Sequence, residues 1–216
     1  MDKKGKLITF EGIDGSGKTT QIKVLSDFLR EKQIAHVCTR EPGGTPAGDR
    51  IRDLLISSRH NLCREAELLL IEASRVQLIK EIILPELEGG KWVLLDRYSD
   101  ATIAYQAFGR GIDLGICETL NNFSTSMLEP DLTFLIRIDP DEGLRRKRKQ
   151  SPGSDDRFEK EDYGFYRRVV EGYDYISGKY GTRVIEVDGK ASSREISRII
   201  QCHVTSFFGD EHGNFQ

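Results

Sequence analysis

Cysteine, histidine and proline are scarce in this sequence, and none of them forms a recognisable pattern. The 216 residues include 4 Cys, 4 His and 6 Pro, and no two cysteines have the CxxC spacing. The histidines also lack the spacing of metal ligands. These absences exclude a disulfide scaffold and a structural zinc site, and they favour a reduced, cytoplasmic protein.

Long hydrophobic runs and an excess of positive charge are missing as well. The first apolar run, residues 7–10, is too short for the core of a signal peptide, and no later segment is long enough to span a membrane. The chain has 32 Lys and Arg against 35 Asp and Glu, a formal net charge of −3. Because nucleic-acid-binding proteins usually carry a basic excess, we expect neither a nucleic acid nor a membrane as partner.

Five short apolar runs alternate with longer segments of helical periodicity. The runs are residues 7–10, 35–39, 92–95, 132–136 and 184–187. The helical segments are residues 19–32, 65–87, 99–108, 114–126, 141–149, 159–179 and 193–207. This alternation predicts an α/β fold in which helices cover both faces of a parallel sheet. No repeat or linker divides the chain, so we expect one domain over residues 1–208 and a disordered tail over residues 209–216.

The strongest motif lies between the first apolar run and the first helical segment. It matches the phosphate-binding pattern G-x-x-x-x-G-K-[ST] and reads Gly12-Ile13-Asp14-Gly15-Ser16-Gly17-Lys18-Thr19. Glycines let the backbone wrap around phosphate oxygens, and the N–H groups at the start of the helix form a positive site. We expect all eight residues to hold the ATP phosphates, with Lys18 on the β- and γ-phosphates and Thr19 on Mg²⁺.

Two features of this loop bear on its substrates. The chain has no Asn-Lys-x-Asp motif for guanine recognition, so ATP is the expected nucleotide. Asp14 places a carboxylate in a loop that binds polyanions, where like charge is costly. It either accepts a hydrogen bond from a hydroxyl of a second substrate or points to solvent, and the residues alone leave both interpretations open.

Four further motifs follow the predicted strands, where α/β enzymes place their chemistry. They are Arg40-Glu-Pro-Gly-Gly-Thr45, Asp96-Arg97-Tyr98, Tyr105-Gln106 and Gly109-Arg110-Gly111. Together with residues 10–21 they resemble the thymidylate kinase family, from about residue 5 to about residue 205. No single one of these motifs is specific for that family, but the occurrence of all five in this order is specific for it.

The resemblance implies a P-loop nucleoside monophosphate kinase, a three-layer α/β sandwich with a parallel five-stranded sheet and a mobile lid. It implies that a homodimer transfers the γ-phosphoryl group of Mg-ATP to dTMP, giving dTDP and ADP. Two alternatives are a kinase for another pyrimidine nucleoside monophosphate and a P-loop switch without catalysis. A switch has no acceptor substrate for the arginines at the strand ends and in the lid to bind, so these arginines favour the enzyme.

Three arginines are candidates for the acceptor phosphate: Arg40, Arg75 and Arg97. A guanidinium binds phosphate through two parallel hydrogen bonds and stays charged. Arg75 lies in a mostly apolar helical segment, so the alternative for it is an internal salt bridge with Glu41 or Glu72.

The helical segment 99–108 carries candidates for nucleoside recognition. The resemblance implies that Thr102 and Gln106 hydrogen-bond the base and that Tyr105 crowds the sugar 2′ position; ordinary packing is the alternative for Tyr105. Many family members have a phenylalanine that stacks on thymine four residues before the arginine at position 75. Ile71 stands there in this chain, on the same helical face as Arg75, and lacks the aromatic stacking energy.

Asp96 ends the third apolar run, where a Walker B carboxylate holds Mg²⁺, if necessary through water. We therefore predict Thr19 and Asp96 as the metal site. Asp139 follows the fourth run, but Pro140 directly after it predicts a helix N-cap there instead.

A basic run, Arg145-Arg-Lys-Arg-Lys149, leads into a segment rich in Ser, Pro and Gly. A solvated helix face or a nuclear localisation signal is the plain interpretation. Because the phosphate loop has no basic residue between Asp14 and Gly17, as in bacterial-type relatives, we expect a lid over residues 145–158 instead. Its candidate catalytic arginines are Arg146, Arg148 and Arg157, acting with Lys18 and Arg97 on the transferred phosphoryl group.

Overall fold

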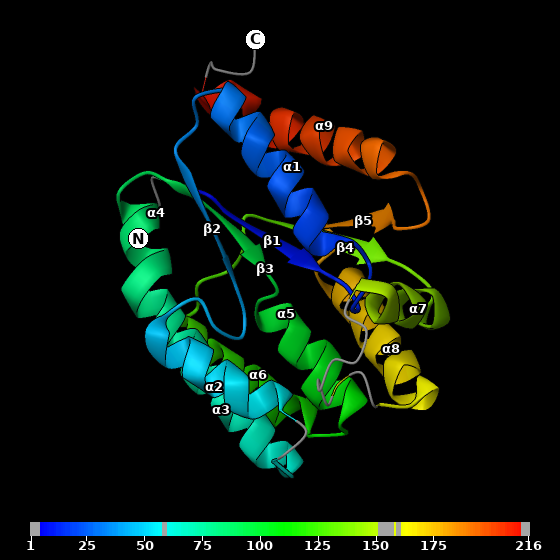
Figure 1. Cartoon of the computed structure of the whole chain (residues 1–216). Helices are drawn as coiled ribbons and strands as arrows, with labels where there is room; N and C mark the ends of the chain where they lie inside the picture. Colours follow the sequence, from blue (N-terminus) through cyan, green and yellow to red (C-terminus); the bar gives the residue numbers. More distant parts are fainter. Residues whose placement is uncertain (1–4, 58–59, 151–157, 159–160, 213–216) are drawn as a thin grey trace.

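A five-stranded parallel sheet forms the centre of the computed structural model, which describes residues 5–57, 60–150, 158 and 161–212 (Figure 1). The strand order is β2-β3-β1-β4-β5. The strands are β1 (Leu7–Glu11), β2 (His36–Arg40), β3 (Trp92–Asp96), β4 (Leu132–Arg137) and β5 (Val184–Asp188). Each predicted apolar run is one of these strands, so the predicted fold class is confirmed.

The first strand lies between β3 and β4, with Ile8 aligned with Leu94 on one side and Leu132 on the other. The chain therefore crosses from one side of β1 to the other, which is the switch point where parallel α/β sheets bind ligands. The segments that follow β1, β3 and β4 all start at this edge of the sheet.

Helices cover both faces of the sheet (Figure 1). They are α1 (Lys18–Glu31), α2 (Pro46–Ile56), α3 (Arg64–Leu78), α4 (Leu84–Glu88), α5 (Ser99–Thr102), α6 (Leu114–Thr125), α7 (Pro140–Gln150), α8 (Tyr163–Lys179) and α9 (Ser193–His212), with π-helical turns η1 (Ile79–Ile83) and η2 (Ile103–Gly109). No helix in the described part of the chain is long and apolar enough to cross a membrane.

Alternate side chains of β1 point to opposite faces, as expected for a strand. Ile8 and Phe10 pack with α1 and α9, which lie together on one face (Figure 1). Leu7 packs on the other face with Leu78 and Ile79, at the junction of α3 and η1. A third apolar cluster joins α8 and η2 on that second face.

The structure corrects three of the predicted helix boundaries. The helix predicted over residues 65–87 consists of α3, η1 and α4, with Pro85 in the first turn of α4. The helix predicted from residue 159 begins at Tyr163, because the Asp162 carboxylate caps it by accepting a hydrogen bond from the Phe165 N–H at 2.6 Å. Helix α9 extends to His212, so residues 209–212 are helical rather than part of a tail.

Helix α2 was missed altogether. Its sequence begins Pro-Ala-Gly, and two further glycines precede its N-cap Thr45, so this composition indicates a loop. Thr45 caps the helix through its hydroxyl, which accepts a hydrogen bond from Gly48 N–H at 3.0 Å, and Pro46 occupies the first helical position, where its missing N–H costs nothing.

Candidate active site

The phosphate-binding loop connects β1 to α1 at the carboxyl edge of the sheet. Gly12, Gly15 and Gly17 all have positive φ, which side chains rarely adopt. A Cβ at Gly12 would collide with the carbonyl oxygen of Ile136 in β4, and one at Gly15 would collide with that of Gly143 in α7. The loop is therefore wedged between the sheet and the first turns of α7.

The Lys18 side chain lies against the backbone of this loop. Its ammonium donates hydrogen bonds to the carbonyl oxygens of Gly12 and Ile13, both at 3.0 Å, and its side chain is buried. Burial, reinforced by the positive charge of Arg97, lowers the pKa of Lys18 to about 8. An anion bound in the loop would favour the charged ammonium form of Lys18, so the loop suits a phosphate group.

The predicted metal pair is brought together. The Thr19 hydroxyl donates a hydrogen bond to Asp96 Oδ2 at 2.8 Å, although the two residues are 77 positions apart. Among the described residues there is no cluster of three or more His, Cys, Asp or Glu side chains that would hold a metal without further ligands. These two oxygens therefore fit a hard cation such as Mg²⁺ that takes its other ligands from phosphate and water.

Asp14 does not point freely to solvent, because it forms an ion pair with Arg97. Its predicted role as the acceptor for a hydroxyl of a second substrate stays a prediction. The Arg97 guanidinium donates to Asp14 Oδ1 at 2.6 Å and to the Tyr105 hydroxyl at 3.0 Å, and its carbon lies 4.7 Å from the centre of the Tyr105 ring. Burial acts to raise the pKa of Asp14, but the charges of Arg97, Lys18 and Lys147 outweigh it and hold the pKa below its ordinary value.

Arg97 has a φ of 69°, in the left-handed region that a residue with a side chain rarely occupies. Glu11 stabilises this turn, because its carboxylate accepts the Tyr98 N–H at 2.7 Å and the Tyr173 hydroxyl at 2.8 Å. Burial, together with the charge of Asp100, raises the pKa of Glu11 to about 8. The sequence analysis missed Glu11, whose only signal is an acidic residue at the end of an apolar strand.

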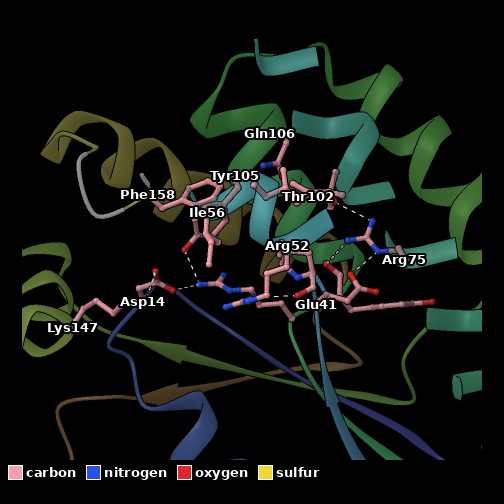
Figure 2. A pocket seen from close by; sticks show the side chains of 16 residues that line it. Asp14, Glu41, Arg52, Ile56, Arg75, Thr102, Tyr105, Gln106, Lys147 and Phe158 are labelled. Atoms are coloured by element: carbon pink, nitrogen blue, oxygen red, sulfur yellow. Dashed lines mark hydrogen bonds and ion pairs between the residues drawn. The ribbon is translucent and has the colours of Figure 1, made fainter. Parts of the chain in front are cut away.

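A cavity opens beside the loop, between the sheet edge and the helices of the second face (Figure 2). We call it the central cavity; its lining includes Asp14, Glu41, Arg52, Ile56, Ile71, Arg75, Arg97, Thr102, Tyr105, Gln106, Lys147 and Phe158. This lining includes all the predicted dTMP-binding side chains except Arg40, which was predicted as a ligand of the acceptor phosphate. The α2 residues Arg52, Leu55 and Ile56 were missed because their helix was missed.

Arg40 and Arg97 share a second hollow with the loop residues Lys18 and Thr19. Arg40 is half exposed and forms an ion pair with Asp49, at 3.2 Å. This hollow and the central cavity meet at Asp14 and Arg97, which line both.

Arg75 is held by two carboxylates, which is the alternative considered for it, and its role as a ligand for the acceptor phosphate stays a prediction. Its side chain is 1% exposed and forms ion pairs with Glu41 and Glu72, both at 2.8 Å. Its other hydrogen bonds go to Thr102, Asn121 and the carbonyl of Tyr98. Burial raises the pKa of Glu41 to about 7, although Arg75 acts in the opposite direction. The internal salt bridge that we considered for Arg75 thus includes both candidate partners.

In the basic run of α7, the residue that reaches the loop is Lys147, whose ammonium lies 3.8 Å from Asp14 Oδ2. Arg146 turns instead to Glu142, at 2.7 Å, and to the carbonyl of Gly189, at 3.1 Å. Arg148 is exposed and borders a separate hollow between α7 and α8. Arg157, the third predicted lid arginine, lies outside the described residues.

Comparison with known proteins gives one consistent result. The family model described as thymidylate kinase matches residues 10–200. The thymidylate kinase of Carboxydothermus hydrogenoformans is 46% identical over 193 residues, covering 89% of this chain and 93% of that protein. That of Nostoc punctiforme is 42% identical over 199 residues, covering 91% and 94%.

A solved structure agrees with these sequence relatives. The crystal structure of thymidylate kinase from Ehrlichia chaffeensis superimposes with a TM-score of 0.75 at 33% identity, covering 93% of this chain and 98% of that one. Since the family model spans most of the chain and the relatives match it nearly end to end, the chain belongs to the thymidylate kinase family.

Proposed function

We propose that this protein transfers the γ-phosphoryl group of ATP to dTMP, giving dTDP and ADP. The observation that carries the proposal is the meeting of two sites at one ion pair. Asp14 and Arg97 line both the hollow at the phosphate loop and the central cavity, and Figure 2 shows Asp14 beside Lys147 at the edge of that cavity. A donor phosphate in the loop and an acceptor phosphate beside Arg97 would then face each other.

In this arrangement residues 12–19 hold the ATP phosphates, and Arg97 and Arg40 hold the acceptor phosphate. An acceptor phosphate oxygen bonds to the γ-phosphorus as the bond from that phosphorus to the β–γ bridging oxygen breaks, and ADP leaves. The acceptor phosphate is already a nucleophile, so no general base is needed. Catalysis rests on positioning and on neutralising negative charge by Lys18 and Arg97.

The rest of dTMP fits the central cavity. Thr102 and Gln106 are proposed to contact the base edge, Ile71 to pack on the base, and Tyr105 to lie against the sugar. All four side chains line the cavity, and Thr102 and Tyr105 lie on the same side of it in Figure 2. Arg75 contributes by holding Thr102 at 3.0 Å.

We propose Mg²⁺ as the cofactor, bound with ATP near Thr19 and Asp96. When bound, Mg²⁺ neutralises charge on the β- and γ-phosphates. The Thr19 hydroxyl and the Asp96 carboxylate orient each other through their hydrogen bond. Lys147, at the same end of the loop, is the α7 residue best placed to add positive charge, while Arg146 and Arg148 remain predictions that require a movement of α7 or of their side chains.

A homodimer is also proposed, on the basis of large exposed apolar side chains on two helices that pack together, α3 and α6. Four large side chains from α3, α6 and the segment after α6 are more than half exposed: Leu69, Ile116, Phe123 and Met127. Monomeric proteins rarely leave such a group uncovered. Light scattering should give the mass of two chains, and Phe123→Glu should reduce it to one.

Replacement of Lys18 tests the proposed function. Lys18→Ala should abolish formation of dTDP and leave the thermal midpoint close to that of the wild type, because the ammonium contacts only the loop carbonyls. Chromatographic separation of dTMP from dTDP measures the product directly. Near-normal turnover by a folded variant would contradict the assignment of the loop as donor site.

A further inference from the structure

The base-facing side of the central cavity is backed by two buried carboxylates of α3. The Gln106 amide nitrogen donates a hydrogen bond to Glu67 at 2.8 Å, and the Thr102 hydroxyl donates one to Glu72 at 3.1 Å. Glu67 is 1% exposed and Glu72 is 5% exposed, so neither reaches the cavity as a ligand itself. Each carboxylate instead accepts a hydrogen bond from a side chain that lines the cavity, Gln106 or Thr102.

A carboxylate accepts hydrogen bonds but donates none, which fixes the polarity of its partner. Gln106 therefore turns its NH₂ group toward Glu67, which leaves its carbonyl oxygen as its acceptor for a ligand in the cavity. The Thr102 hydroxyl gives its hydrogen to Glu72 and receives one from Arg75, at 3.0 Å. The Thr102 hydroxyl can therefore only accept a further hydrogen bond from a ligand.

Glu67 is itself held in place. Arg110 Nε lies 3.1 and 3.2 Å from its two oxygens, and the Arg110 guanidinium lies 4.6 Å from the centre of the Phe165 ring. Arg110 also pairs with Glu161, at 2.5 Å. If the Gln106 amide rotated by 180°, its carbonyl oxygen would face the Glu67 carboxylate and a buried hydrogen bond would be lost.

We propose that Glu67 is a positioning residue that sets base specificity: it presents Gln106 as a hydrogen-bond acceptor and so selects pyrimidines that carry a hydrogen on N3. Thymine and uracil have this N–H, whereas N3 of cytosine is an acceptor and would face an acceptor oxygen. A site built to bind an N–H discriminates strongly against an analogue that lacks it. This inference rests on the proposed function, since it assumes that the base occupies the central cavity.

The direct test compares dTMP with 5-methyl-dCMP, which differ only at the N3 and C4 positions of the base. In Glu67→Gln the new amide can donate to Gln106, so the Gln106 amide is free to rotate. The ratio of kcat/KM for dTMP over 5-methyl-dCMP should fall at least tenfold, with a gain for 5-methyl-dCMP. A general loss of structure would lower both values and leave their ratio unchanged.

Glu161→Gln is the matched control, because Glu161 shares the Arg110 contact, whereas the Gln106 amide bonds to Glu67. In this control the ratio of kcat/KM for dTMP over 5-methyl-dCMP should stay within about twofold of the wild-type ratio. An unchanged ratio in Glu67→Gln, or an equal fall in both variants, would overturn the proposal.

A second variant keeps the test decisive if Glu67→Gln does not fold. Gln106→Ala removes the acceptor, so the ratio of kcat/KM for dTMP over 5-methyl-dCMP should fall in this variant as well. A preserved ratio in Gln106→Ala would refute the role of Gln106, and with it that of Glu67. If the wild type does not phosphorylate dTMP at all, the proposed function itself is refuted.

Discussion

The contact between α7 and the phosphate loop makes Gly143→Ala a sensitive perturbation. A Cβ at Gly143 would lie 2.7 Å from the carbonyl oxygen of Asp14 and 2.9 Å from Ile13 Cδ1. Replacing a helical glycine by alanine stabilises by up to about 1 kcal/mol. Overpacking against backbone costs about 1–3 kcal/mol, so the expected net loss is between about zero and 3 kcal/mol. A loop displaced by up to about 1 Å should also lower turnover, by as much as about 100-fold.

Gly178→Ala in α8 is the matched control, because a Cβ there meets no atom within 4 Å. It should raise the free energy of unfolding by about 0.5–1 kcal/mol and leave turnover unchanged. Urea titration measures stability in both variants, and steady-state kinetics measures turnover. If Gly143→Ala gains as much stability as the control and keeps full activity, α7 does not press on the loop and the reasoning fails.

Three further predictions concern the interior, the base site and the loop. Arg75→Leu should lower the free energy of unfolding by about 3–5 kcal/mol in urea, because Glu41 and Glu72 lose their buried partner; an unchanged midpoint would contradict the ion pairs. Ile71→Phe should tighten dTMP binding by up to about fivefold through stacking, or weaken it if the ring is too large, and calorimetry that shows neither would remove α3 from the base site. Since the pKa of Lys18 is lowered to about 8, ATP should bind with proton uptake above pH 8 and with little near pH 7; calorimetry in buffers of different ionisation enthalpy measures the uptake, and equal uptake at both pH values would contradict the shift.

The sheet was predictable because its strands are buried on both faces. Runs such as residues 92–95 and 132–136 are almost continuously apolar, and five of them separated by helices leave few alternatives. Helix α2 was not predictable from composition, since its start depends on the Thr45 cap and Pro46 rather than on a long apolar periodicity. That one error concealed Arg52 and Ile56 of the central cavity.

The phosphate loop was predicted residue by residue because its chemistry depends on local spacing. Contacts between residues far apart in the sequence were not predicted. An example is the ion pair between Asp14 and Arg97, which are 83 positions apart. The basic run of α7 illustrates the same limit. Five consecutive basic residues surround a helix on all sides, so only the packing of α7 on the loop selects Lys147 rather than Arg146 or Arg148.

The most direct test of the central claim is ADP release from ATP with a panel of acceptors: dTMP, dUMP, dCMP, dGMP and the ribonucleotide of thymine. We predict the highest kcat/KM for dTMP, a lower value for the ribonucleotide because Tyr105 is proposed to lie against the sugar, and a strong discrimination against dCMP. A preference for dCMP or dGMP, or no acceptor-dependent release of ADP, would contradict it.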